Sequence, residues 1–167
     1  MQAEGDVIRL PAAEPAPPDF AAFFAEEHAG LFKALYFVTG NRSDAAELAQ
    51  DAFLKLWERW DRIERIHDPT GYLFRAALNG FRMRTRAAVR ATRRLVPIVS
   101  TTDPFDEIDL RMLLDLSPRQ RAALVLLDMY GYGSEEAARI MGIRPSTVRA
   151  LATQGRAVLR KGNPHDA

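Results

Sequence analysis

The chain holds 167 residues, of which 47% are hydrophobic and 27% are charged. This composition is ordinary for a globular protein and allows one domain or two small ones, of which we expect two. The sequence contains no cysteine, which excludes disulfides, thiolate zinc sites and thiol redox sensing, and is compatible with a reducing cytoplasm.

The net charge of +1 conceals an uneven distribution of charged residues. Between Asp19 and Asp61 there are eight acidic and four basic residues, whereas residues 69–102 hold seven arginines and no acid. Residues 143–163 hold five basic residues and again no acid. An acidic front, a basic middle and a basic end indicate separate surfaces for separate partners.

Several functional classes are not expected from the sequence. His28, His67 and His165 are scattered without ligand spacing, so we expect neither a metal site nor a cofactor. No apolar run approaches the roughly 18 residues of a membrane span, so no membrane insertion is expected. The first residues carry Glu4 and Asp6 and lack a hydrophobic segment, which is not the pattern of a secretory signal.

The chain begins with a predicted flexible tail, followed by a first helix. Residues 1–18 hold four of the ten prolines among alanines and acids, a composition that buries too little apolar surface to order the chain. Apolar residues at helical spacing predict a helix over residues 19–39, with Gly40 and Asn41 as its stop. Ser43 is the predicted cap of a second helix.

The second helix has one apolar and one acidic face. The predicted inner stripe consists of Ala45, Leu48, Ala49, Ala52, Phe53, Leu56 and Trp60. The outer face consists of Asp44, Glu47, Gln50, Asp51, Leu54, Lys55 and Glu58. This outer face is either a solvated helix surface or an interaction surface.

A loop over residues 61–67 is predicted to lead into an arginine-rich helix. Asp68 followed by Pro69 is a helix entry signal, because a carboxylate can accept free N–H groups of the first turn. Arginines and aromatic rings together favour a nucleic-acid surface, although a solvated face or a site for an acidic protein remains an alternative. We expect Phe74 and Phe81 in the core, and Tyr72 as the better candidate for a base contact.

The C-terminal part is predicted to be a helix-turn-helix unit. Prolines and a Ser-Thr-Thr run predict a linker over residues 95–106, and a short helix follows over residues 106–116. Ser117 and Gln120 form a capping box for a helix whose predicted buried residues are Ala122, Leu124, Val125, Leu127 and Met129. A helix over residues 134–141, ended by Gly142, and a last helix opened by Pro145 complete the pattern.

The last predicted helix carries arginines on its outer face. Val148, Leu151, Ala152, Val158 and Leu159 point inward, while Arg149, Thr153, Arg156 and Arg160 share the outer face. That face could lie in a DNA major groove, with Arg149 near base edges and the later arginines on phosphate. Basic helices also end many helical hairpins that do not bind DNA.

Three segments in order resemble one known family. They are DAAELAQDAFLKLWERWDRI, HDPTGYLFRAALN and LSPRQRAALVLLDMYGYGSEEAARIMGIRPSTVRALATQGRAVLR. Together they resemble bacterial RNA polymerase sigma factors of the extracytoplasmic-function (ECF) group of the sigma-70 family, over about residues 19–162. The resemblance implies an all-α fold of two small helical domains, region 2 at 19–94 and a helix-turn-helix region 4 at 107–163, joined by the flexible linker at 95–106.

The resemblance also implies partners and site residues. The clamp helices of the largest subunit of core RNA polymerase would bind Glu47, Gln50, Asp51, Leu54, Lys55 and Glu58. The separated strand of the minus-ten promoter element would contact the predicted loop over residues 61–67 and, on the helix after it, Tyr72, Arg75, Asn79, Arg82, Arg84 and Arg86. The minus-thirty-five element would be read by Arg144, Ser146, Thr147, Arg149, Thr153, Arg156 and Arg160. Members of this family are commonly held by an anti-sigma factor, which is therefore an expected partner.

The sequence as a whole favours a promoter-specificity subunit that is not an enzyme. No nucleophile stands at a defensible spacing from a base, and the carboxylates fall on predicted solvated faces or at helix caps. Two rival hypotheses stay open. One is a stand-alone helix-turn-helix regulator, and the other is a protein-interaction module that does not bind DNA.

Overall fold

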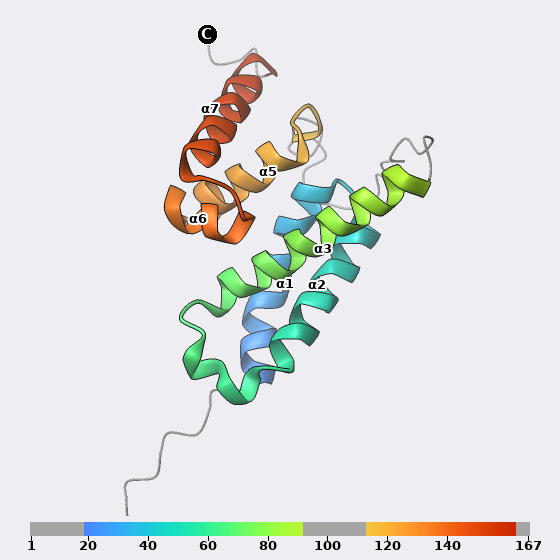
Figure 1. Cartoon of the computed structure of the whole chain (residues 1–167), viewed down its shortest axis with the longest axis vertical. Coiled ribbons are helices and arrows are strands. Elements are labelled where there is room, and N and C mark those ends of the chain that lie inside the picture. Colours follow the sequence, from blue (N-terminus) through green and yellow to red (C-terminus); the bar gives the residue numbers. More distant parts are fainter. Residues whose placement is uncertain (1–18, 92–112, 163–167) are drawn as a thin grey trace, which may run out of the picture.

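The computed structural model describes residues 19–91 and 113–162, and every regular element in these two ranges is helical (Figure 1). The elements are α1 (Phe20–Thr39), α2 (Arg42–Trp57), the 3₁₀ helix η1 (Trp60–Arg65), α3 (Pro69–Ala91), α5 (Pro118–Leu124), the π-helical turn η2 (Val125–Met129), α6 (Ser134–Met141) and α7 (Pro145–Gly162). The predicted all-α fold is confirmed. The predicted tail, the linker and most of the helix predicted over residues 106–116 lie outside the described residues.

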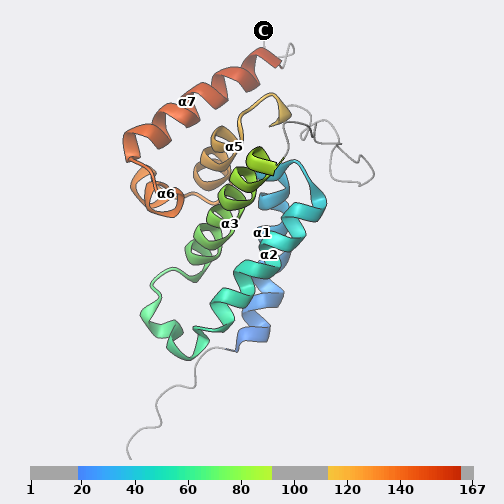
Figure 2. The ribbon, with the colours of Figure 1, turned by 45° about the vertical axis from the view of Figure 1, so that its right-hand side comes forward.

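Helices α1, α2 and α3 pack together (Figure 2). We call residues 19–91, which contain these helices, the front half of the molecule. Asp19 caps α1 by accepting the Ala21 N–H at 3.0 Å, and Gly40 ends it in the left-handed conformation at φ +67°. All seven residues of the inner stripe predicted for α2 and its C-terminal end are buried. The period of apolar residues therefore identified the packing face of this helix correctly.

Two predictions for the front half are wrong. The cap of α2 is Asn41 and not Ser43, because Asn41 has an extended backbone and its Oδ1 accepts the Asp44 N–H at 3.0 Å. The predicted loop over residues 61–67 is mostly the 3₁₀ helix η1. Trp60 and Ile63 are buried there, since residues three apart lie on one side of a 3₁₀ helix and can pack against the core together.

Helix α3 begins as predicted, and its glycines are explained by close packing. Asp68 Oδ1 accepts the Gly71 N–H at 2.9 Å, which caps the helix. Phe74 is fully buried, whereas Phe81 is only half-buried at the rim of the core. A methyl group at Gly80 would lie 3.1 Å from the Leu48 side chain, so the glycine permits the close approach of α2 and α3.

The C-terminal half is built from α5, η2, α6 and α7. Ser117 and Gln120 form the predicted capping box, with N–H to side-chain oxygen distances of 2.9 and 3.2 Å. Gly142 ends α6 at φ +66°, as predicted. Met129 was predicted to be buried but is 47% exposed, because the helix widens into a π-turn from Val125 onward, which rotates later side chains away from the expected face.

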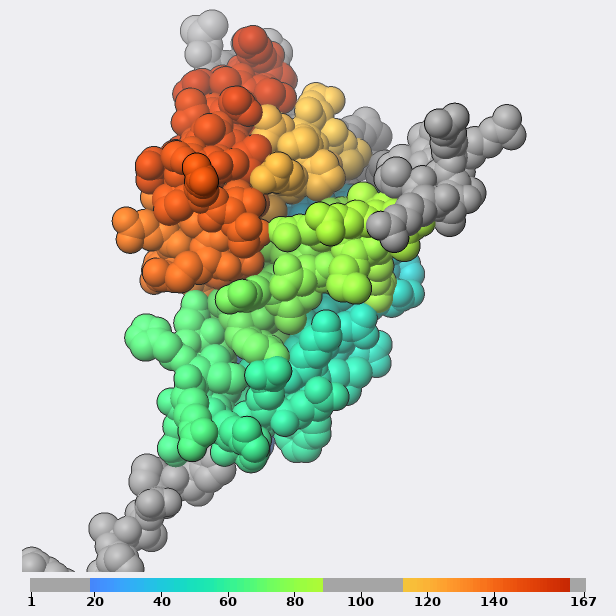
Figure 3. Space-filling view, viewed as in Figure 1, coloured from blue at the N-terminus to red at the C-terminus, as the bar shows by residue number. Residues whose placement is uncertain are grey.

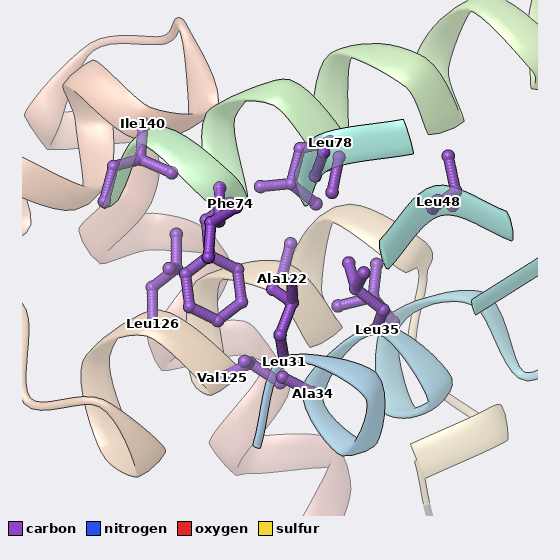
Figure 4. Close-up of a cluster of buried hydrophobic side chains, with 14 of the residues drawn as sticks. Leu31, Ala34, Leu35, Leu48, Phe74, Leu78, Ala122, Val125, Leu126 and Ile140 are labelled. Atoms are coloured by element: carbon purple, nitrogen blue, oxygen red, sulfur yellow. The ribbon is translucent and has the colours of Figure 1, made fainter. Parts of the chain in front are cut away.

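The two halves share one hydrophobic core. In the space-filling view the C-terminal half lies directly against α3 (Figure 3). Leu31 and Leu35 of α1, Phe74 of α3 and Leu126 and Ile140 of the C-terminal half converge in a single buried cluster (Figure 4). The predicted two-domain organisation therefore takes the form of two units packed together.

Arg121 ties the halves together from within this core. Its side chain is buried, and its Nε donates to the carbonyl oxygen of Val38 at 2.9 Å, while Nη1 donates to that of Leu113 at 3.3 Å. Burial lowers the pKa of Arg121 below its usual value, but arginine remains charged in proteins. A buried guanidinium needs such acceptors, because an unpaired buried charge is strongly destabilising.

Replacing Ser117 by alanine is expected to lower the free energy of unfolding by about 1 kcal/mol, because the capping box at the start of α5 loses its side-chain acceptor. Thermal unfolding followed by circular dichroism measures the effect. Ser43→Ala is the matched control, since Asn41 caps α2 and the Ser43 substitution should stay within about 0.5 kcal/mol. A larger loss at Ser43 than at Ser117 would contradict this assignment of the caps.

Candidate polymerase and nucleic-acid interfaces

The outer face of α2 brings together all six residues predicted to bind polymerase. Glu47, Gln50, Asp51, Leu54, Lys55 and Glu58 are all exposed. Leu54 is 54% exposed within this largely acidic surface. An exposed leucine alone is unremarkable, so the surroundings of Leu54 decide what this face can do.

An aromatic groove adjoins Leu54 where α1 and α2 meet. It is lined by Phe20, Phe24, His28, Ala46, Gln50, Phe53, Leu54 and Trp57. Trp57 is 56% exposed, and its ring centroid lies 4.8 Å from that of Phe20 in an edge-on contact. The sequence did not identify Phe24 and Trp57 as site residues. Trp57 falls outside the predicted buried stripe of α2, and this position was a signal that its ring is exposed.

The residues predicted to bind the minus-ten element are not equally available on α3. Arg75, Asn79, Arg82 and Arg86 are exposed, whereas Tyr72 and Arg84 are half-buried. Arg82 Nη2 donates to the carbonyl oxygen of Met141 in α6 at 2.6 Å. Arg75 and Arg86 are therefore the exposed arginines of this set for which no such intramolecular bond is described.

Arg84 links the predicted DNA surface to the predicted polymerase surface. Its guanidinium bonds Glu47 at 2.7 Å and Asp51 at 2.9 Å. These partners are exposed, so the ion pairs contribute little stability, at most about 1 kcal/mol each. The family resemblance places Arg84 with the DNA contacts, whereas in the structure Arg84 neutralises part of the acidic face of α2.

Tyr72 has a cationic neighbour that the sequence analysis missed. The guanidinium carbon of Arg59 lies 5.9 Å from the centre of the Tyr72 ring. Tyr72 packs partly against the core, so only part of its ring can meet a base. A tyrosine and an arginine side by side are suited to stacking on an unpaired base and pairing with its phosphate.

A cationic groove of 530 Å³ lies between α3 and α5. Arg82, Arg86 and Arg119 line it together with an apolar surface that includes Leu78 and Phe81. Arginine side chains beside the half-buried Phe81 ring place phosphate contacts next to an aromatic surface. The groove therefore extends the predicted minus-ten surface beyond α3 itself.

The outer face of α7 carries its predicted residues. Arg149, Thr153, Arg156 and Arg160 are exposed on the helix, Arg144 and Ser146 are exposed at its start, and Thr147 is half-buried. Two of the arginines already have partners. Arg149 Nη1 donates to Ser134 Oγ at 3.1 Å, and Arg156 pairs with Asp128 at 2.6 Å, which raises the pKa of Arg156. A phosphate would have to compete with Asp128 for Arg156.

Titration of Tyr132 is expected to weaken the fold at alkaline pH. Burial raises the pKa of Tyr132 above its ordinary 10.0, and a hydrogen bond with Asp68 raises the pKa further. Above pH 10 the unfolded chain therefore releases a proton that the folded chain keeps, and the free energy of unfolding should fall as the pH rises.

Urea unfolding below and above pH 10 measures this fall. Tyr132→Phe should make it less steep. Phe37→Leu is the control, because it changes a half-buried ring without removing a hydroxyl, and it should leave the steepness unchanged. An equally steep fall in Tyr132→Phe and in the unsubstituted chain would remove Tyr132 as its source.

Other kinds of site are not found in the part of the chain that the structure describes. Within residues 19–91 and 113–162, no three His, Asp or Glu side chains gather so that they could hold a metal ion. No helix in these ranges combines the length and the apolar character needed to cross a membrane.

Two family models match the chain in the order of its two halves. Residues 23–91 match Sigma-70 region 2, and residues 110–159 match Sigma-70, region 4. The front half has three helices, with an acidic outer face on α2 and a cationic α3, and the C-terminal half is a helix-turn-helix unit. This arrangement defines the class of proteins built from sigma regions 2 and 4.

Individual relatives agree with this class. The chain is 31% identical over 146 residues to the ECF RNA polymerase sigma factor SigE of Mycolicibacterium smegmatis. This match covers 78% of the chain but only 56% of SigE. It is 26% identical over 148 residues to SigM of Mycobacterium tuberculosis, covering 85% of the chain and 76% of SigM. The chain belongs to the extracytoplasmic-function group of the sigma-70 family.

Solved structures share the fold. The sigma factor RpoE of Bartonella quintana, in complex with the anti-sigma factor NepR, superimposes with a TM-score of 0.70 at 23% sequence identity. The match covers 89% of this chain and 99% of RpoE. At this identity the likeness supports the arrangement of helices and not the roles of single residues.

Proposed function

We propose that this chain is a non-enzymatic promoter-specificity subunit that binds core RNA polymerase, directs it to a set of promoters and helps to melt the minus-ten element. The observation that carries the proposal is the placement of three distinct surfaces on the two sigma regions. An acidic and aromatic surface lies on α1 and α2, and cationic surfaces lie on α3 and on α7.

The surface on α2 fits a cationic partner with apolar side chains. Leu54 and Trp57 offer exposed apolar area, and Glu47, Asp51 and Glu58 surround it with negative charge. Aromatic anchors with a charged rim are typical of protein interfaces, where the charges steer association and the anchors supply affinity. We propose the clamp helices of the largest polymerase subunit as this partner, as the family resemblance implies.

The cationic surfaces fit the two forms of promoter DNA. Capturing a base from a separated strand costs a few kcal/mol, which stacking and phosphate contacts must offset. Tyr72, Arg59 and Arg75 on the front half can supply such contacts. The exposed arginines of α7 lie on a helix that can enter a major groove, so we assign this helix to the minus-thirty-five duplex.

An anti-sigma factor is a further proposed partner. Support comes from RpoE, which has the same arrangement of helices and was solved with the anti-sigma factor NepR. Such a partner would have to cover at least one of the three surfaces to inhibit transcription.

The test is transcription in vitro with core polymerase on a library of genomic DNA fragments, with the start sites read by sequencing. We expect new start sites that depend on the chain and that disappear with Asp51→Ala and Leu54→Ala. Initiation that is identical with and without the chain would overturn the proposal. Specific duplex binding without polymerase would instead favour a stand-alone regulator, and binding of neither DNA nor polymerase would favour an interaction module.

Replacing Arg82, Arg84 and Arg86 together by alanine is expected to flatten the salt dependence of DNA binding. Each lost single-strand phosphate contact changes the slope of log affinity against log salt by roughly 0.7. Since Arg84 is engaged by Glu47 and Asp51, we expect a change of about one to two contacts, near 0.7 to 1.4.

Fluorescence anisotropy of a single-stranded oligonucleotide library, with the chain bound to core polymerase, measures this slope. Arg139→Ala removes an exposed arginine of α6 outside the predicted surfaces and serves as the control. An unchanged slope in the triple variant would remove these arginines from the DNA surface.

A further inference from the structure

Two arginines on the outer face of α7 are held by side chains from outside that helix. Arg149 Nη1 donates to Ser134 Oγ at 3.1 Å, and Ser134 is the first residue of α6. Arg156 donates to both carboxylate oxygens of Asp128 in η2, from Nη2 at 2.6 Å and from Nε at 3.2 Å. Both partners therefore come from segments that precede α7 in the C-terminal half, and not from α7 itself.

Close packing beside Arg156 brings it to its partner. A methyl group at Gly155 would lie 3.0 Å from the Leu124 side chain, so the glycine lets α7 approach the end of α5. Arg156 is the next residue along α7, and Asp128 follows Leu124 by about one helical turn. This approach of the two helices places the carboxylate within reach of the guanidinium.

The bonds to these arginines add little to stability. The side chains of Arg156 and Asp128 are 46% and 47% exposed, and an exposed ion pair contributes at most about 1 kcal/mol. A free arginine side chain has about 2 kcal/mol of rotamer entropy, part of which is lost when it binds a partner in one orientation. Side chains that are oriented before binding avoid part of this loss. The bonds therefore matter more for orientation than for the fold.

Each guanidinium keeps free donors for DNA. A guanidinium has five N–H donors in a planar fork. Arg149 uses only Nη1 toward Ser134, which leaves its Nε and Nη2 for a pair of acceptors such as O6 and N7 of guanine. Arg156 uses Nε and Nη2 toward Asp128, which leaves Nη1 for a phosphate oxygen. A phosphate thus competes with Asp128 only for the edge that Asp128 already occupies.

We propose that Ser134 and Asp128 are positioning residues for reading the minus-thirty-five element. Ser134 turns the free edge of Arg149 toward a guanine, and Asp128 holds Arg156 so that Nη1 meets the DNA backbone. The base contact supplies sequence discrimination, and the phosphate contact fixes the register of α7 on the duplex. This inference deepens the function proposed above and rests on it.

The test measures discrimination by the full chain bound to core polymerase. Duplex promoter fragments from the transcription assay, with the upstream element either intact or scrambled, compete for the complex, and the ratio of the two affinities is the readout. We expect Ser134→Ala to lower this ratio roughly fivefold or more, and single base-pair changes should place the loss at a guanine. Ser134→Thr keeps a hydroxyl group and should retain the ratio of the unsubstituted chain.

Double substitutions identify the arginine through which each residue acts. Ser134→Ala should add nothing to Arg149→Ala, and Asp128→Asn should add nothing to Arg156→Ala. Asp128→Asn alone should lower the ratio by a smaller factor, and it should not steepen the salt dependence of binding, because Arg156 already meets a phosphate. A slope steeper by roughly 0.9 would show that Asp128 shields Arg156 from DNA, and would overturn its positioning role.

The ratio separates positioning from folding and from charge. A variant that only loosens α7 weakens binding of the intact and scrambled fragments by the same factor, so an unchanged ratio in Ser134→Ala and Asp128→Asn would overturn the proposal. Glu135→Gln is the control, because it removes an exposed charge next to Ser134 and should leave the ratio unchanged. An unsubstituted chain that binds both fragments equally would instead overturn the assignment of α7 to the minus-thirty-five element, and the positioning roles with it.

Discussion

Replacing Trp57 by alanine is expected to weaken the binding of core RNA polymerase by roughly 30-fold or more. Trp57 presents more than half of its surface beside Leu54, next to an acidic rim. Buried aromatic anchors at interfaces commonly contribute 2 kcal/mol or more, which corresponds to about 30-fold in affinity. Titration of labelled chain with core polymerase, followed by fluorescence anisotropy, measures the loss.

Two comparisons separate loss of binding from loss of structure. Trp57 also contacts Phe20, so circular dichroism and thermal unfolding must show that α1 and α2 stay folded. Met129→Ala is the matched control, because Met129 is a large apolar residue with similar exposure on the C-terminal half. We expect unchanged affinity for Met129→Ala. Equal affinity for Trp57→Ala and the unsubstituted chain would show that polymerase does not cover the aromatic groove.

Local signals in the sequence were sufficient to predict most helices and their ends. Helix caps act within one helical turn, so they can be predicted from neighbouring residues alone. The examples here are Ser117 with Gln120, Asp68 with Pro69, and Gly142. The buried stripe of α2 follows from helical periodicity for the same reason. The prediction for Ser43 failed because Asn41, two residues earlier, competes for the same role and reaches the Asp44 N–H first.

The contacts between residues far apart in the sequence could not be predicted from it. Arg121 bonds Val38 and Arg84 bonds Glu47, pairs that are distant along the chain and brought together only by tertiary packing. The sequence held one indirect signal, which is glycine inside helices. Gly80 lies against Leu48, and Gly155 lies against Leu124, so both glycines mark close helix packing.

The shared core predicts a large stability effect at Phe74. Its side chain is only 1% exposed and packs between α3 and the C-terminal half, where it meets the Tyr130 ring. Phe74→Ala should lower the free energy of unfolding by about 3–5 kcal/mol, because the lost contacts leave a cavity that the surroundings refill only in part. At about 2–4 °C per kcal/mol, the melting temperature should fall by roughly 6–20 °C.

Hydrogen exchange distinguishes a shared core from two independent ones. If Phe74 stabilises both halves, Phe74→Ala should reduce amide protection in α5 and α6 as well as in α1 and α3. Phe32→Ala is the control, because Phe32 is half-buried on α1, stacks on Tyr36 and should cost less. Unchanged protection of α5 and α6 in Phe74→Ala would mean that each half keeps its own core. Phe74 would then stabilise the front half alone.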